Sequence, residues 1–443
     1  MSVQTGPLAP VSGRHRSRRW RRFAIAASIS AIAAIIGWKW ALPVIQFPQS
    51  TGRYDIGTVT SDWIDQSRPD IFSADPDQRR ALVVQIWYPA ISVADAPPAP
   101  YMADAHAVMT AFAARLGYPA VLFRQFAAAT THAQPSAPVA DGQSAYPVLL
   151  FLEGAAGFRQ MNMFQVEELV SQGYIVAAID QPGTAASVVF SDGRRADGSS
   201  ADELRGLIQP SYMPGKTAPP LHGRPFAATS IIPFLAQDVS FVIDRLAALD
   251  QSDPNSMLSG HLDLRNIGLF GVSLGGIVVG EACLRDRRIG ACLMMDAPMT
   301  TDVVTTGLSQ PSLWITRDAA MMRLERQSAG GWPEADIAAH QTSMRAAFNG
   351  ATGPAYLVQI DGAFHSNFTD VPNWSPLTEV LGVSGPIGGQ RAHRIINAVS
   401  VAFFDHHLKG FAIASRLTGL AGVYPEVQIE THEPQRTGDG PLE

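Results

Sequence analysis

Cysteine is almost absent from this sequence, and Cys283 and Cys292 are the only two among 443 residues. Two cysteines cannot make a disulfide-rich scaffold, and their spacing matches neither a zinc site nor a redox motif. One lies in a stretch with a helical pattern and the other in the next apolar strand. A disulfide is conceivable in an exported protein, but we predict two buried thiols that pack as small apolar residues.

Charged residues are also scarce, at 16% of the chain, and the formal net charge is −6. A nucleic-acid-binding protein needs a basic surface, so this balance argues against nucleic acid as a partner. Hydrophobic residues make up 46% of the chain, which excludes wholesale disorder and allows a sizeable core. The length is sufficient for one large α/β domain or two ordinary domains.

Basic residues are concentrated in residues 1–22, where six arginines precede a nearly continuous apolar run. The run covers residues 23–45, is interrupted by Lys39, and has about the length of a membrane span. The positive-inside rule keeps the basic flank in the cytoplasm, so the body of the protein is exported to the periplasm or the extracellular space. We predict an uncleaved transmembrane anchor that attaches the body of the protein to the membrane. The alternative is a cleaved signal peptide followed by secretion, although no clean Ala-x-Ala site follows the run.

Buried strands alternate with helical patterns through residues 46–430, which predicts an α/β fold with a mostly parallel central sheet flanked by helices. Residues 147–152 form a fully apolar run that is typical of a central parallel strand, and residues 174–180 form the next. Residues 46–80 are rich in Pro, Asp, Ser and Arg, so we predict an extended linker that becomes the edge of the domain.

The periodic pattern disappears over residues 181–231, where only residues 201–208 have helical spacing. A structureless stretch of this length is uncommon in a compact domain and is often functional. We interpret it as an excursion over the active-site edge of the catalytic domain, with a plain surface insertion as the alternative. Residues 431–443 form a polar tail.

Residues 266–277 contain Gly-x-Ser-x-Gly between an apolar run and a small-residue helical pattern. This arrangement is typical of the nucleophile elbow of an α/β-hydrolase, in which the serine stands on a sharp strand-to-helix turn. Gly271 and Gly275 supply the small residues that the turn requires on either side of Ser273. The helix N-terminus beneath the serine favours developing negative charge. The alternative is a glycine-rich turn between buried elements.

A serine nucleophile needs a base, usually a histidine that a carboxylate orients, and in this fold the order along the chain is Ser, acid, His. His365 is the one histidine that follows a buried strand late in the chain. Two acids stand at suitable strand ends, Asp296 after the first strand beyond the elbow and Asp318 after the next. Each could instead be a helix N-cap, and the residues alone leave both open.

Short motifs along the chain carry a family resemblance. They are Thr51-Gly52-Arg53-Tyr54-Asp55-Ile56-Gly57-Thr58, Gln85-Ile86-Trp87-Tyr88-Pro89, Tyr174-Ile175-Val176-Ala177-Ala178, Gly271-Val272-Ser273-Leu274-Gly275-Gly276, His365-Ser366-Asn367-Phe368-Thr369-Asp370 and Phe403-Phe404-Asp405-His406-His407-Leu408-Lys409-Gly410. Together they resemble the platelet-activating factor acetylhydrolase family, the plasma and intracellular type II lipases with bacterial relatives. The resemblance extends over residues 50–412, and the histidine motif is its most specific part.

This resemblance implies a calcium-independent serine esterase on an α/β-hydrolase fold, with Ser273 as nucleophile and His365 as base. It places the acid directly after the strand that follows the elbow, which here is Asp296. It also implies oxyanion-binding amides at Leu274 and Ala155. No metal and no other cofactor is expected, and the substrate is a small-molecule or lipid ester.

The chain departs from the family at the turn that contains Ala155. The family usually has a Ser-His-Gly-Leu-Gly-like turn where this chain has Leu152-Glu153-Gly154-Ala155-Ala156. Glu153 thereby puts an acidic group near the site. We expect it to disfavour anionic leaving groups by like-charge repulsion.

The acyl side of the pocket is predicted to be lined by Phe158, Leu274, Met299 and Phe364, because each stands beside a catalytic position. The alternative is that these four are core residues. Short-chain esters, including an acetyl ester on a glycerophosphocholine, are expected to be hydrolysed faster than long-chain triglycerides and anionic lysophospholipid esters. Two other functions stay open: a dienelactone-hydrolase-like or polyester-cleaving esterase, and a catalytically inactive α/β-hydrolase that serves as a binding module.

Overall fold

The structure is a computed structural model of the chain, and it describes residues 2, 3, 6, 37 and 39–432, except 214, 226–229, 256 and 412–413. The chain divides into a unit that ends at Pro43 and a unit that begins at Val44, and the fold described below is that of the second unit. The predicted anchor at residues 23–45 lies mostly outside the described residues. Among the helices of the described part, none is long and apolar enough to span a membrane.

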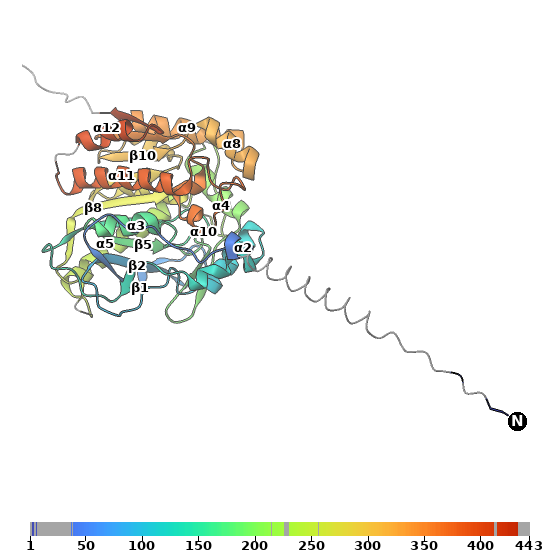
Figure 1. Cartoon of the computed structure of the whole chain (residues 1–443). Helices are drawn as coiled ribbons and strands as arrows, with labels where there is room; N and C mark the ends of the chain where they lie inside the picture. Colours follow the sequence, from blue (N-terminus) through green and yellow to red (C-terminus); the bar gives the residue numbers. More distant parts are fainter. Residues whose placement is uncertain are drawn as a thin grey trace, which may run out of the picture. The chain divides into compact units, whose positions relative to one another are not determined.

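A sheet of ten strands, counted over the described residues, forms the centre of the second unit (Figure 1). Its middle strands run parallel. In their order across the sheet they are β5 (Ile175–Asp180), β4 (Tyr146–Leu152), β8 (Leu262–Val272), β9 (Ile289–Met295), β10 (Ser312–Thr316) and β11 (Ala355–Ile360). The outer strands are β2 (Arg79–Ala90), β1 (Asp55–Pro69) and β3 (Ala133–Pro135) beyond β5, and β12 (Val427–His432) beyond β11.

Helices cover both faces of this sheet (Figure 1). Successive strand residues point to opposite faces, so Leu150 packs into one hydrophobic core and Phe151 into the other. The core around Leu150 includes residues of α5 (Ile232–Gln251), α6 (Leu274–Arg285) and α9 (Glu334–Asn349), and the core around Phe151 includes residues of α2 (Ala105–Leu116), α3 (Met163–Ser171) and α11 (Gly389–Leu408). The predicted α/β class, a mostly parallel sheet flanked by helices, is therefore confirmed.

Shorter elements connect these layers. The described part of residues 181–231 contains the hairpin of β6 (Ser187–Val189) and β7 (Arg195–Asp197), then α4 (Ala201–Ile208) and η2 (Gln209–Ser211). The others are η1 (Ala120–Ala128), α7 (Thr301–Thr306), α8 (Ala319–Ala329), η3 (His365–Phe368), α10 (Val371–Trp374) and α12 (Ala414–Val423).

Residues 46–80 lie near the edge of the sheet, as predicted, but they are not a linker: they contain the long strand β1, which is next to the edge strand β3. The strand pairs antiparallel with β2 from Asp55 to Asp65. Ile56 and Trp63 are buried in the core, whereas several residues between them are partly or fully exposed. A strand with one solvated face carries no continuous apolar run, which is why composition alone indicates a linker.

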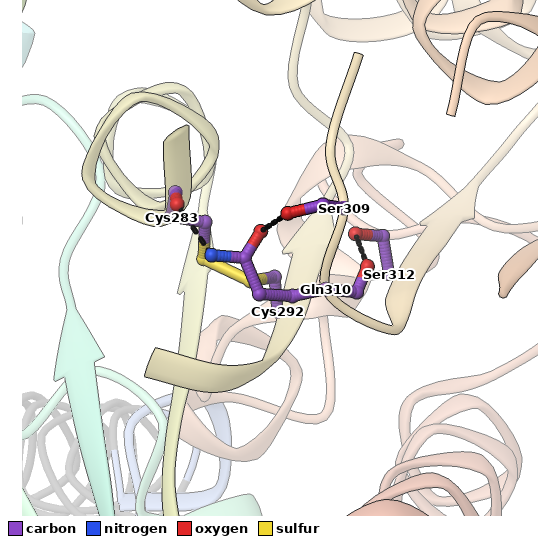
Figure 2. Close-up of a disulfide and its surroundings, with 5 residues drawn as sticks. All are labelled: Cys283, Cys292, Ser309, Gln310 and Ser312. Atoms are coloured by element: carbon purple, nitrogen blue, oxygen red, sulfur yellow. Dashed lines mark hydrogen bonds between the residues drawn. A yellow bond between two sulfur atoms is a disulfide. The ribbon is translucent and has the colours of Figure 1, made fainter. Parts of the chain in front are cut away.

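Cys283 in α6 and Cys292 in β9 form a disulfide (Figure 2), which corrects the expectation of two free thiols. Their Cα atoms are 6.5 Å apart, within the range that a disulfide bridges. Beside the disulfide, the side-chain amide of Gln310 donates a hydrogen bond of 2.7 Å to the carbonyl of Cys283 (Figure 2). The disulfide therefore ties the helix that follows Ser273 to the strand that precedes Asp296.

Reduction of this disulfide is expected to lower the free energy of unfolding by about 2–3 kcal/mol, because a short closed loop restricts the unfolded chain. The measurement is urea unfolding followed by tryptophan fluorescence, with and without dithiothreitol. The matched control is the double variant Cys283→Ser/Cys292→Ser, whose midpoint should not respond to the reductant. A wild-type midpoint that stays fixed in dithiothreitol would contradict the expectation.

Candidate active site

The serine elbow is formed where β8 ends at Val272 and α6 begins at Leu274. Ser273 lies between them with φ 56° and ψ −120°, a strained conformation for a residue with a side chain. The turn leaves no space for a Cβ atom at Gly275, where such an atom would lie 2.0 Å from the carbonyl oxygen of Leu152. The amide of Ser273 donates a hydrogen bond of 2.9 Å to the carbonyl of Met295, which holds the elbow against β9.

The glycine turn after β4 lies directly beside the serine. A Cβ atom at Gly154 would lie 3.3 Å from the Cβ and 3.9 Å from the Oγ of Ser273, so the backbone approaches the serine closely. The turn is held by the Ala156 amide, which donates a hydrogen bond of 2.8 Å to the carbonyl of Thr184. Ala155 is exposed and lines the same cavity as Ser273 and Leu274. The two amides predicted to bind an oxyanion thus belong to residues on the wall of one cavity.

The acid and the histidine come from neighbouring regions of the sheet. Asp296 follows β9 with φ 44°, and its amide donates a hydrogen bond of 2.8 Å to the carbonyl of Ile315 in β10. His365 begins η3 after β11, and its Nδ1 lies 2.6 Å from Oδ2 of Asp296. Asp318 has a different partner: its carboxylate accepts a hydrogen bond of 2.7 Å from the Met321 amide and caps α8.

Trp332 contacts His365 and also lines the cavity that contains Ser273. Its ring centroid lies 5.6 Å from that of His365. Ser273, Asp296 and His365 thus follow the ends of β8, β9 and β11, and His365 contacts Asp296, whereas no hydrogen bond joins His365 to Ser273 among the contacts of the described residues. Among the described residues, no group of three or more His, Cys, Asp or Glu side chains is arranged to hold a metal ion.

The carboxylate of Asp296 is ionised although it is fully buried. Burial opposes its ionisation, but Arg317 and the hydrogen bond to His365 outweigh burial and hold the pKa of Asp296 well below its usual range. The Nε of Arg317 donates a hydrogen bond of 2.8 Å to Oδ2 of Asp296. Sequence reasoning did not identify Arg317 as a functional residue, and its position one residue after β10 was the only available signal.

A cavity of about 300 Å³ opens above the serine. Leu204, Arg205 and Ile208 of α4, which belong to the excursion at residues 181–231, form part of its wall. Arg115 at the end of α2 also lines the cavity. The excursion therefore contributes directly to the space beside Ser273.

Three of the four predicted acyl-side residues are core residues instead. Phe158, Met299 and Phe364 have exposed fractions of 1%, 0% and 2%, and the cavity is lined by other side chains. Phe158, for example, stacks on Trp374 in an aromatic cluster. Leu274 does line the cavity. Adjacency in sequence to a catalytic position is a poor guide here, because successive strand and turn residues point in different directions.

Glu153 does not present a negative charge to the cavity. Its side chain is buried, and its Oε1 accepts a hydrogen bond of 3.2 Å from the Gln181 amide. Burial and the nearby charge of Asp180 raise the pKa of Glu153 well above its ordinary value, which favours its neutral form, and Glu153 is not among the residues that line the cavity. The expected repulsion of anionic leaving groups by Glu153 is therefore corrected.

Comparison with known proteins gives a consistent result. A family model described as platelet-activating factor acetylhydrolase, isoform II, matches residues 41–205. The platelet-activating factor acetylhydrolase of Cavia porcellus is 22% identical over 62% of this chain and 60% of its own length. That of Gallus gallus is 23% identical over 65% of this chain and 68% of its own length. This chain resembles the platelet-activating factor acetylhydrolase family.

The family model ends before the elbow, so Ser273, Asp296 and His365 lie outside the matched residues. The aligned stretch spans less than two thirds of the length of the Cavia porcellus acetylhydrolase. Among solved structures, a ferulic acid esterase from Streptomyces cinnamoneus is 27% identical with a TM-score of 0.66, over 87% of this chain and 99% of that chain. The solved esterase thus shares the fold on which this site is built.

Proposed function

We propose that the protein is a serine hydrolase that cleaves carboxylic esters through an acyl-enzyme and resembles platelet-activating factor acetylhydrolase in its chemistry. The observation that carries the proposal is the buried hydrogen bond between Asp296 and His365 beside a strained serine elbow. Such an arrangement supports nucleophilic catalysis, because a serine hydroxyl needs a base and the base needs a fixed orientation.

The reaction has two halves that use the same groups. Ser273 attacks the ester carbonyl while His365 accepts its proton and then passes that proton to the leaving alcohol. The amides of Leu274 and Ala155 donate to the oxyanion, each worth about 3–4 kcal/mol of transition-state stabilisation. Water then attacks the acyl-enzyme by the same route, so the acid is released and Ser273 is restored.

The test of this proposal is covalent labelling by a fluorophosphonate probe, which reacts with activated serines. The wild-type protein should be labelled at Ser273, and the Ser273→Ala variant should not. Absence of labelling in folded wild-type protein would instead favour the catalytically inactive binding module. A dienelactone-hydrolase-like or polyester-cleaving esterase would be labelled too and differs only in substrate.

The preferred substrate is an ester that carries an anionic group near the scissile bond, such as the phosphate of a glycerophosphocholine. Arg115 and Arg205 line the cavity beside Ser273, as does one acid, Asp336 of α9, and the charge of Glu203 also acts on Arg115. The Nη1 of Arg115 is buried and has no hydrogen-bond partner among the described residues, and burial lowers the pKa of Arg115. A desolvated guanidinium gains most from a phosphate or carboxylate partner.

Removal of the Arg115 charge is expected to affect only anionic substrates. In Arg115→Gln, kcat/KM for 3-acetoxybenzoate should fall about tenfold or more, the worth of a charge-assisted hydrogen bond. The value for the uncharged and equally sized 3-acetoxybenzamide should stay within about twofold. Arg323→Gln, which removes an exposed arginine that pairs with Glu334, is the control and should change neither. If Arg115→Gln lowered kcat/KM equally for the anionic and the uncharged ester, recognition of the substrate's negative charge by Arg115 would be contradicted.

The second part of the proposal is that the catalytic domain is exported and attached to a membrane by the N-terminal segment. The six arginines before an apolar run support this, and the disulfide supports an oxidising compartment. The full-length protein should sediment with membranes in high salt, whereas a chain that begins at Gln46 should remain in the supernatant and hydrolyse esters. Soluble full-length protein with an intact N-terminus would contradict the anchor. If the soluble protein instead had lost its N-terminal segment, the result would favour a cleaved signal peptide and secretion.

A further inference from the structure

Asp296 has a second hydrogen-bonding partner besides His365. Arg317 is fully buried, and its Nε donates a hydrogen bond of 2.8 Å to Oδ2 of Asp296. The Nδ1 of His365 lies 2.6 Å from the same oxygen. The carboxylate therefore divides its charge between the guanidinium and the imidazole. An arginine in this position weakens the hold of Asp296 on a protonated histidine.

Glu325 balances that arginine. From α8, its carboxylate forms an ion pair with Nη1 of Arg317. Its other oxygen accepts a hydrogen bond of 3.1 Å from the backbone amide of His365. Glu325 thus contacts both the cation that competes for Asp296 and the residue that Asp296 orients. Its side chain is 12% exposed, so this negative charge lies in a poorly solvated place, where it acts strongly on nearby charges.

One more titratable group faces Asp296. His340 of α9 is fully buried, and its Nε2 lies 3.6 Å from Oδ1 of Asp296. Burial lowers the pKa of His340 to about 4, so it is neutral above that pH. The charged groups around the Asp296–His365 pair are therefore Arg317 from the end of β10 and Glu325 from α8, with neutral His340 from α9.

We propose that Arg317 and Glu325 are positioning residues that set the acid limit of ester hydrolysis. The inference rests on the proposed function, because it requires that His365 be neutral to accept the proton of Ser273. Arg317 disfavours the imidazolium form of His365, and Glu325 favours it. The pair acts through Asp296 and through the His365 backbone, and it touches neither the serine nor the cavity.

Removal of each partner is expected to move the acid limb of the kcat/KM profile in opposite directions. In Arg317→Met the imidazolium gains stability, so the midpoint of the acid limb should rise by about 1 pH unit. In Glu325→Gln the imidazolium loses an anion, so the midpoint should fall by a similar amount. The double variant should return close to the wild-type midpoint. Arg317→Lys retains the charge and should shift the midpoint less than Arg317→Met.

The profile is measured on the intact protein with p-nitrophenyl acetate, an uncharged ester, so that recognition by Arg115 and Arg205 does not contribute. Arg345→Met/Glu430→Gln removes an exposed ion pair between α9 and β12 and is the control, which should leave the midpoint unchanged. Lower kcat with an unmoved midpoint in both Arg317→Met and Glu325→Gln would mean a purely structural role and would overturn the proposal. The proposal would also be overturned if the midpoints of Arg317→Met and Glu325→Gln shifted in the same direction.

Arg317→Met removes the buried guanidinium that pairs with Asp296 and can fail to fold. In that case the Glu325→Gln variant alone tests the proposal, which requires the midpoint of the acid limb of its kcat/KM profile to fall. Failure of the proposed function has a different signature: Ser273→Ala would then retain turnover, or wild-type protein would not react with the fluorophosphonate. If Ser273→Ala is inactive and Glu325→Gln has the wild-type midpoint, the hydrolase proposal stands and this inference fails.

Discussion

Ser273→Ala and His365→Ala are each expected to lower kcat for ester hydrolysis by about 10⁴-fold to 10⁶-fold. The serine oxygen is the nucleophile that attacks the ester in the proposed mechanism, and the histidine is the base that activates it. The two residues act as one unit, so the double variant should be little worse than either single variant. The measurement is the steady-state kcat for p-nitrophenyl acetate, compared with the rate in buffer alone.

The folded state should survive both substitutions. Ser273 is partly exposed, and its side chain packs beside Gly154 rather than filling a core position. Thermal unfolding midpoints should therefore stay near that of the wild type. Ser240→Ala is the matched control, since it also removes one serine hydroxyl, which donates to Asp286 away from the site. Substantial turnover in Ser273→Ala would show that another group is the nucleophile.

The features that sequence alone could predict are those with local signatures. A run such as residues 147–152, apolar on both faces, is buried as β4. The elbow is equally local, because the turn requires small residues at Gly271 and Gly275 whatever the rest of the chain does. Because the histidine of this fold comes after the serine in the chain, the choice of base is limited to a histidine that follows a late strand, which here is His365. These predictions needed no knowledge of which strands become neighbours.

The features that were missed depend on strand order and on helix packing. Arg317 reaches Asp296 because β10 lies beside β9, and Glu325 of α8 contacts Arg317 and the backbone amide of His365. The disulfide depends in the same way on α6 lying over β9. Glu153 was misread for a related reason: its position after β4 was predicted, but the direction of its side chain was not.

The residue patterns alone offer two candidates for the acid of the triad, and only the tertiary structure shows which of them contacts His365. Asp296 and Asp318 stand at the ends of neighbouring strands, β9 and β10, and residue patterns treat them alike. In the structure Asp296 contacts His365 at 2.6 Å, whereas Asp318 accepts a hydrogen bond from the Met321 amide. A conservative change at each position therefore tests the assignment directly.

Asp296→Asn is expected to lower kcat by about 10⁴-fold, because an amide can donate to Nδ1 of His365 and so favours the tautomer that cannot accept the serine proton. Asp318→Asn should leave kcat within about twofold and stability nearly unchanged, because asparagine is as good an N-cap as aspartate. Each variant replaces one carboxylate with an amide of nearly the same size. A difference in kcat between the two variants therefore comes from the position of the residue and not from the kind of change. Kinetics on p-nitrophenyl acetate and thermal unfolding are measured for both.

Stability has to be separated from catalysis in Asp296→Asn, because Arg317 then loses a buried anionic partner. Arg317 keeps its ion pair with Glu325, so we expect a folded protein with a lower unfolding midpoint. A folded Asp296→Asn variant still reacts slowly with the fluorophosphonate at Ser273, which an unfolded one does not. If Asp318→Asn were the inactive variant and Asp296→Asn the active one, the acid would be Asp318, and His365 would have to change partner during turnover.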